Sequence, residues 1–84
     1  MMPISLVYVY KFLLYKAHYL RETEKLDAAL AALKDSHRFC SRTPFPLFLV
    51  AEWLIEARQN QKAGAYAERA LVLVRKIIVT IPSL

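Results

Sequence analysis

The heptapeptide Asp27-Ala-Ala-Leu-Ala-Ala-Leu33 has a counterpart in the second half of the chain, Glu68-Arg-Ala-Leu-Val-Leu-Val74, at an offset of 41 in the numbering. The same offset places Phe12-Leu13 on Trp53-Leu54. A fixed period of about 20 to 50 residues is typical of supersecondary units that stack on one another. The sequence therefore predicts two copies of one unit.

The predicted copies cover about residues 3–40 and 44–82 of a single domain spanning residues 1–84. Apolar residues recur at helical spacing through both. The first copy is expected to begin with a helix over about residues 4–19, which is apolar nearly all round and therefore buried on several sides. Thr23 is the expected N-cap of the second helix. The amphipathic face of that helix consists of Leu26, Ala29, Leu30, Leu33 and His37.

Pro44 and Pro46 predict the main break, because a proline cannot continue a helix. A third helix is expected over about residues 46–60. Gly64, the only glycine, is expected in the turn that follows it. The last segment, residues 66–81, is rich in β-branched residues, but its apolar residues fall on one helical face, which favours a helix.

Composition and charge limit the class of protein. The chain is 57% hydrophobic with one Gly and four Pro, which excludes a disordered chain. The net charge is +5, and residues 1–21 contain three basic residues and no acid. Basic residues at the ends of the chain suit an acidic partner surface. Exposed basic helices that contact only water would give the same distribution of charge.

Cys40 is the only cysteine, so no intramolecular disulfide forms and an intracellular location, cytoplasmic or nuclear, is expected. The longest uncharged stretch at the N-terminus, residues 1–10, is too short for a transmembrane helix of about 20 residues. It also lacks the features of a secretory signal peptide.

The positions that carry a family resemblance are Ala17, Leu20, Leu26, Ala29 and Leu33 in the first copy and Leu54, Ala70, Val74 and Pro82 in the second. At these positions the helical pairs resemble the tetratricopeptide-repeat family, in which a small residue of the first helix packs against an alanine of the second. The departures are Arg58, which stands where a small residue is expected, Ser36 and Ile77, which replace another usual alanine, and the long period of 41. They leave a related helical repeat and a plain four-helix bundle as alternatives. The resemblance implies an all-α fold of two antiparallel helical hairpins, stacked as a short right-handed solenoid.

The resemblance also implies a concave partner-binding groove lined by the first helix of each hairpin. Carried over by position, the groove residues of the first copy are Lys11, Leu14, His18, Arg21 and Glu22. Those of the second copy are Glu52, Ile55, Gln59 and Lys62. A mixed apolar and charged groove fits a helix or an extended segment of a partner protein.

Trp53 lies with Phe45 and Phe48 in an aromatic cluster. The residues leave two interpretations open: core packing, and, if a ring is exposed, an anchor for an interface.

Catalytic and metal-binding chemistry is not expected. His37 and Cys40 offer two ligands where a structural zinc site needs four. One glycine excludes a glycine-rich phosphate loop, and no orienting group accompanies a Cys–His pair. We therefore expect no enzyme activity, no cofactor, no metal and no small-molecule substrate.

The predicted function is that of a scaffold or protein-interaction module in a larger complex. Because about three repeats are normally needed for stability, we expect the apolar end faces to be covered by a second copy, another subunit or further repeats. Association with a membrane surface is the alternative, based on the apolar first helix and on Arg75 and Lys76. Binding of nucleic acid rests on charge alone and is disfavoured, because no compact Lys/Arg run is present.

Overall fold

The computed structural model describes the backbone of residues 3–79 and the side chains of residues 6–79. Over that range the chain forms four α-helices and no β-strand. The helices are α1 (Pro3–Glu22), α2 (Leu26–Phe39), α3 (Phe45–Glu56) and α4 (Asn60–Val79). The predicted all-α class is confirmed, and the β-branched segment of the second copy is helical.

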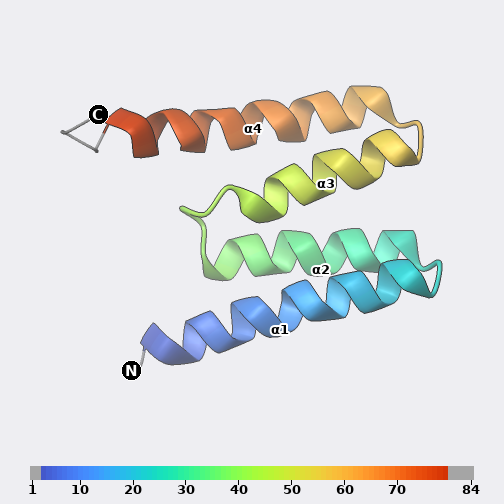
Figure 1. Ribbon diagram of the computed structural model, residues 1–84, viewed down its shortest axis with the longest axis horizontal. Coiled ribbons are helices and arrows are strands. Elements are labelled where there is room, and N and C mark those ends of the chain that lie inside the picture. Colours follow the sequence, from blue (N-terminus) through green and yellow to red (C-terminus); the bar gives the residue numbers. More distant parts are fainter. Residues whose placement is uncertain (1–2, 80–84) are drawn as a thin grey trace. The chain divides into compact units, whose positions relative to one another are not determined.

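The helices form two antiparallel hairpins, α1 with α2 and α3 with α4 (Figure 1). The chain divides into two compact units, and the boundary falls between Ser41 and Arg42, in the connection that precedes α3. Pro44 occupies the N-cap position of α3 and Pro46 lies in its first turn, where a missing N–H breaks no helical hydrogen bond. The prolines therefore separate the hairpins, as predicted.

The first hairpin is built around small side chains. Ala17 of α1 and Ala29 of α2 are both fully buried. Small residues on packed helices let the helix axes approach closely. Leu33, on the apolar side of the amphipathic helix α2, is also fully buried.

The second hairpin has a richly apolar first helix. The buried residues of α3 are Pro46, Leu47, Leu49, Val50, Ala51, Trp53 and Leu54. α4 buries Ala63 and Ala70, which again are small.

Both hairpin turns have the same backbone structure. In the first, the N–H of Glu24 donates to the carbonyl of Arg21 and the N–H of Lys25 to that of Leu20. This pair of bonds, from C′ to C2 and from C″ to C3, is a Schellman motif. In the second, Arg58 donates to Ile55 and Gln59 to Leu54 in the same pattern.

Matching the two turns to each other gives a structural offset of 34, from Glu24 to Arg58, so the offset of 41 is wrong as a structural register. At an offset of 34, Ala17 corresponds to Ala51, Leu20 to Leu54, Ala29 to Ala63 and Ser36 to Ala70. All of these residues except Leu20, which is half-buried, are buried. Ala51 is thus the small residue of the second hairpin, and the apparent mismatch at Arg58 disappears.

Two local predictions were wrong. Gly64 lies inside α4, and the turn is formed by residues 57–59. Thr23 does not cap α2, because its hydroxyl donates to the carbonyls of Tyr19 and Leu20 at the end of α1. The N-cap of α2 is Lys25, which makes no side-chain capping bond.

Candidate partner-binding surface

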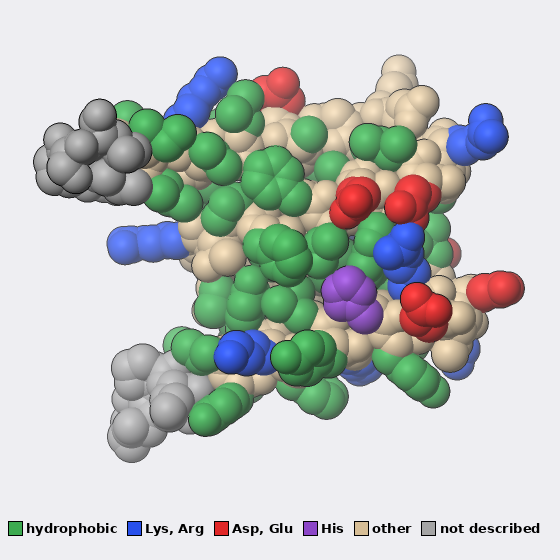
Figure 2. Space-filling view, viewed as in Figure 1, with side chains coloured by type: hydrophobic (Ala, Val, Ile, Leu, Met, Phe, Trp, Pro, Cys, Tyr) green, Lys and Arg blue, Asp and Glu red, His purple; other side chains and the backbone are tan. Residues whose placement is uncertain are grey.

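The most conspicuous surface feature of the first hairpin is a row of aromatic rings on α1. Tyr8, Phe12, Tyr15 and Tyr19 are 64, 61, 71 and 66% exposed. Their spacing of four, three and four residues places them along one side of the helix, opposite the buried Ala17. We call these four residues the α1 stripe. Hydrophobic side chains project from α1 on its side away from α2 (Figure 2).

Basic residues flank the α1 stripe. Lys11 and Lys16 are exposed and lie on opposite edges of it, one turn from the aromatic rings. The first acidic residue of α1 is Glu22, in its last turn. The stripe is therefore an apolar surface with positive edges.

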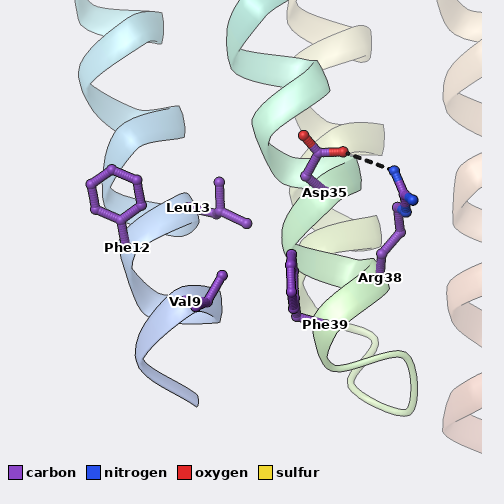
Figure 3. Close-up of a pocket in the computed structure, with 6 residues that line it drawn as sticks. All are labelled: Val9, Phe12, Leu13, Asp35, Arg38 and Phe39. Carbon is purple, nitrogen blue, oxygen red and sulfur yellow. Dashed lines mark hydrogen bonds and ion pairs between the residues drawn. The ribbon is translucent and has the colours of Figure 1, made fainter. Parts of the chain in front are cut away.

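An open hollow of about 530 Å³ lies beside Phe12, between α1 and α2 (Figure 3). Its lining consists of Val9, Phe12, Leu13, Asp35, Arg38 and Phe39. The Arg38 guanidinium lies 3.5 Å from an Asp35 carboxylate oxygen, one turn away on α2. Both charged side chains are largely exposed, so this pair contributes little to stability. The hollow extends the apolar surface of the stripe toward α2.

The five residues predicted to line the groove in the first hairpin share one face of α1. Lys11, His18 and Glu22 are exposed, and Leu14 and Arg21 are half-buried. The structure thus presents a polar, mainly basic face beside the α1 stripe.

The groove residues predicted for the second hairpin are not all on its first helix. Glu52 and Ile55 lie on α3 and are exposed, but Gln59 lies in the turn and Lys62 on α4, because α3 ends at Glu56. The wrong offset of 41 caused this error. At an offset of 34, the counterparts of Lys11, Leu14, His18, Arg21 and Glu22 are Phe45, Phe48, Glu52, Ile55 and Glu56.

These five residues form an exposed face that combines apolar and acidic side chains. Phe45, Phe48 and Ile55 are 48, 44 and 57% exposed, and Glu52 and Glu56 are exposed beside them. We call Phe45, Phe48, Glu52, Ile55 and Glu56 the α3 face. Sequence reasoning assigned only Glu52 and Ile55 to the groove, although the correct period would have given all five.

Trp53 does not serve as an exposed anchor. Only 2% of its surface is exposed, so the core-packing interpretation holds.

The α1 stripe was missed because α1 was expected to be buried on several sides. The signal was present in the sequence, since four aromatic residues at 4-3-4 spacing form a single helical seam.

The positions predicted to hold the repeat together are mostly interior. Ala17, Ala29, Leu33, Leu54 and Ala70 are buried. Leu20 and Val74 are half-buried, and Pro82 lies outside the described residues.

Titratable groups gather where the end of α2 meets α1. Burial raises the pKa of the Tyr10 phenol above its usual value of 10.0, and an electrostatic interaction with Cys40 raises this pKa further. The Nδ1 atom of His37 is buried and has no hydrogen-bond partner among the residues that the structure describes. Within residues 6–79, no three His, Cys, Asp or Glu side chains are grouped in a way that could hold a metal ion.

None of the helices in the described part of the chain has the length and apolar character needed to cross a membrane. Comparisons of the chain with protein-family models, with curated proteins and with solved structures found no match. The function must therefore be argued from the exposed surfaces themselves.

Proposed function

We propose that this chain is a non-catalytic protein-interaction module, a tetratricopeptide-like pair of hairpins that acts as a scaffold subunit in a larger complex. The observation that carries the proposal is the exposed α1 stripe. Four large aromatic rings on one face are more than scattered surface apolar residues, and such contiguous patches mark interaction sites. Tyrosine is also enriched among the residues that dominate binding energy.

The family assignment in this proposal is supported by the period. The hairpin turns repeat at an offset of 34, which is the usual length of a tetratricopeptide unit. The pairs Ala17 with Ala29 and Ala51 with Ala63 provide buried small residues in both helices of each hairpin. The long period inferred from the heptapeptides was the main departure from the family, and the structural register removes it.

The partner surface in this proposal includes the predicted groove residues of α1 beside the stripe. Lys11 and Arg21 outweigh Glu22 and give this face a positive character that would match an acidic segment of another protein. The α3 face offers apolar and acidic side chains from the second hairpin. No catalytic group is required for either role.

Purification of the tagged chain from cells that express it, with quantitative mass spectrometry, tests this function. We expect specific proteins to co-purify with the wild type and to be lost with the Lys11→Glu/Arg21→Glu variant. A matched variant, Lys34→Glu/Arg42→Glu, has the same net charge change away from α1 and should retain them. Recovery of the chain without any other specific protein would contradict the scaffold role.

Binding to a membrane surface is the second candidate function. The α1 stripe combines aromatic rings with Lys11 and Lys16, and interfacial helices combine aromatic and basic residues in the same way. Flotation with vesicles containing about 30% anionic lipid distinguishes membrane binding from protein binding. An interfacial helix binds such vesicles in proportion to its buried apolar area and to the anionic charge of the lipid.

A further inference from the structure

Three of the four rings of the α1 stripe stand at positions that are buried in the second hairpin. At the offset of 34, the counterparts of Phe12, Tyr15 and Tyr19 are Pro46, Leu49 and Trp53. All three counterparts are at least nine-tenths buried. The first hairpin thus carries apolar residues at positions that are covered in its sister hairpin.

The complementary surface is present in the chain itself. Phe45, Phe48, Glu52 and Ile55 follow a spacing of three, four and three residues, and the α1 stripe follows four, three and four. Both patterns have the period of about 3.5 residues that is typical of a seam along which two helices pack. At about 1.5 Å per residue, each seam is roughly 15 Å long, so the two match in length.

Charge complementarity favours the same pairing. The α1 stripe is edged by Lys11 and Lys16, whereas the α3 face carries Glu52 and Glu56. Tyrosine hydroxyls normally require a hydrogen-bond partner when they are buried. The stripe has three such hydroxyls, on Tyr8, Tyr15 and Tyr19, and a Glu52 carboxylate within the opposing seam can accept bonds from them.

Two alternative pairings among the described helices are less complementary in charge. Pairing of α1 with α1 of a second copy would bring Lys11 and Lys16 close to the same lysines. The face of α4 that exposes Leu71, Val72 and Ile78 carries Arg75 as well as Glu68, so it lacks the two acidic side chains of the α3 face. Like charges brought together across an interface cost affinity.

We propose that the α1 stripe of one copy docks on the α3 face of a second copy. The aromatic seam packs against Phe45, Phe48 and Ile55, and the two lysines lie near the two glutamates. This inference rests on the proposed interaction function and names one of its partners, the chain itself.

The test is the solution mass of the full chain, measured by light scattering and sedimentation over about 5 μM to 1 mM. We expect concentration-dependent association, weakened by added salt because exposed charges are screened. Replacing Phe12 and Tyr15 by serine should weaken association by about 30-fold or more, the loss typical of central aromatic residues in an interface. Replacing Leu71 and Val72 by serine is the matched control and should leave it unchanged.

A charge-swap experiment identifies the two surfaces. Lys11→Glu/Lys16→Glu and Glu52→Lys/Glu56→Lys should each be monomeric alone, because each then has two faces of like charge. When the two variants are mixed, they should associate with each other, because the acidic α1 stripe of one variant contacts the basic α3 face of the other. Lys25→Glu/Lys34→Glu is a control with the same charge change as the first variant and should associate like the wild type. Circular dichroism and melting temperature check the fold of each variant.

A wild-type chain that stays monomeric at 1 mM would overturn the proposal, whether or not it floats with anionic vesicles. An oligomer that is insensitive to both the serine and the charge-swap substitutions would also overturn it. Either result would leave the scaffold function to be judged by co-purification of other proteins, so the two proposals fail separately.

Discussion

Glu24 and Arg58 occupy equivalent positions in the two hairpins and have the same left-handed backbone conformation, with φ of 61° and 64°. Each lies at the C′ position of a Schellman motif, at the end of the first helix of its hairpin. Glycine is the usual residue there because it has no Cβ to clash. The two positions define the structural period of the chain.

Glu24→Gly and Arg58→Gly should each stabilise the protein by roughly 0.5–1 kcal/mol. Relief of the left-handed strain, about 1–2 kcal/mol, exceeds the added entropy of the unfolded chain, about 0.5–1 kcal/mol. Urea denaturation followed by circular dichroism measures the change. Ala57→Gly, one residue before Arg58 and at φ of −87°, is the control and should destabilise, because it adds the entropy without relieving strain.

Ala17→Leu and Ala51→Leu should both destabilise the fold by about 1–3 kcal/mol, because each overfills a site where two helices approach closely. Equal effects at the two positions follow from the register of 34. Ala31→Leu, at an exposed position of α2, should change the free energy of unfolding by less than about 0.5 kcal/mol. Tolerance of leucine at Ala51 would contradict that register.

Trp53→Ala should destabilise the chain by about 3–5 kcal/mol through the cavity it leaves. Any loss of partner binding in this variant would therefore report unfolding. Ile55→Ala, on the exposed α3 face, should unfold near the wild-type midpoint. Thermal and chemical denaturation of the two variants distinguish these outcomes, and a Trp53→Ala variant of wild-type stability would contradict the burial of this ring.

Stability should fall as pH rises above about 10, partly through Tyr10. Its pKa is raised in the folded state, so between the unfolded and folded pKa values the unfolded chain has lost a proton that the folded chain retains. The stabilisation is fully present below the unfolded pKa and is lost as pH rises through the folded pKa.

Tyr10→Phe should reduce this loss, as seen by comparing denaturation midpoints at about pH 8 and pH 11. Tyr8→Phe replaces an exposed ring of the same helix and is the control. Identical pH dependence in the wild type and Tyr10→Phe would show that this phenol does not contribute.

The helical class and the division into two hairpins could be predicted because periodicity and the Pro44–Pro46 break act locally. The turns could not, because their left-handed positions hold Glu24 and Arg58, while the only glycine lies within α4. Among the described residues none lies close to the position of a Cβ at Gly64, so their packing does not require a glycine there.

The candidate site could also be predicted only in part, because the exposure of a helix face depends on tertiary packing. Apolar composition led to the expectation that α1 is buried, but composition does not specify which faces are covered, and Tyr15 is among the most exposed rings. The heptapeptides of residues 27–33 and 68–74 align at an offset of 41 although they do not occupy equivalent positions in the two hairpins. The hydrogen bonds of the turns, together with the burial of Ala51 and Ala63, distinguish 34 from 41.

The most direct test of a protein-binding role for α1 is site-specific photo-cross-linking in cells that express the chain. A photoreactive phenylalanine analogue replaces Tyr15, and the same analogue at the exposed Ala31 of α2 is the control. We expect discrete protein adducts at Tyr15, to another protein, to a second copy or to both, and none at Ala31. Absence of any protein adduct at Tyr15, with a folded and expressed chain, would contradict it.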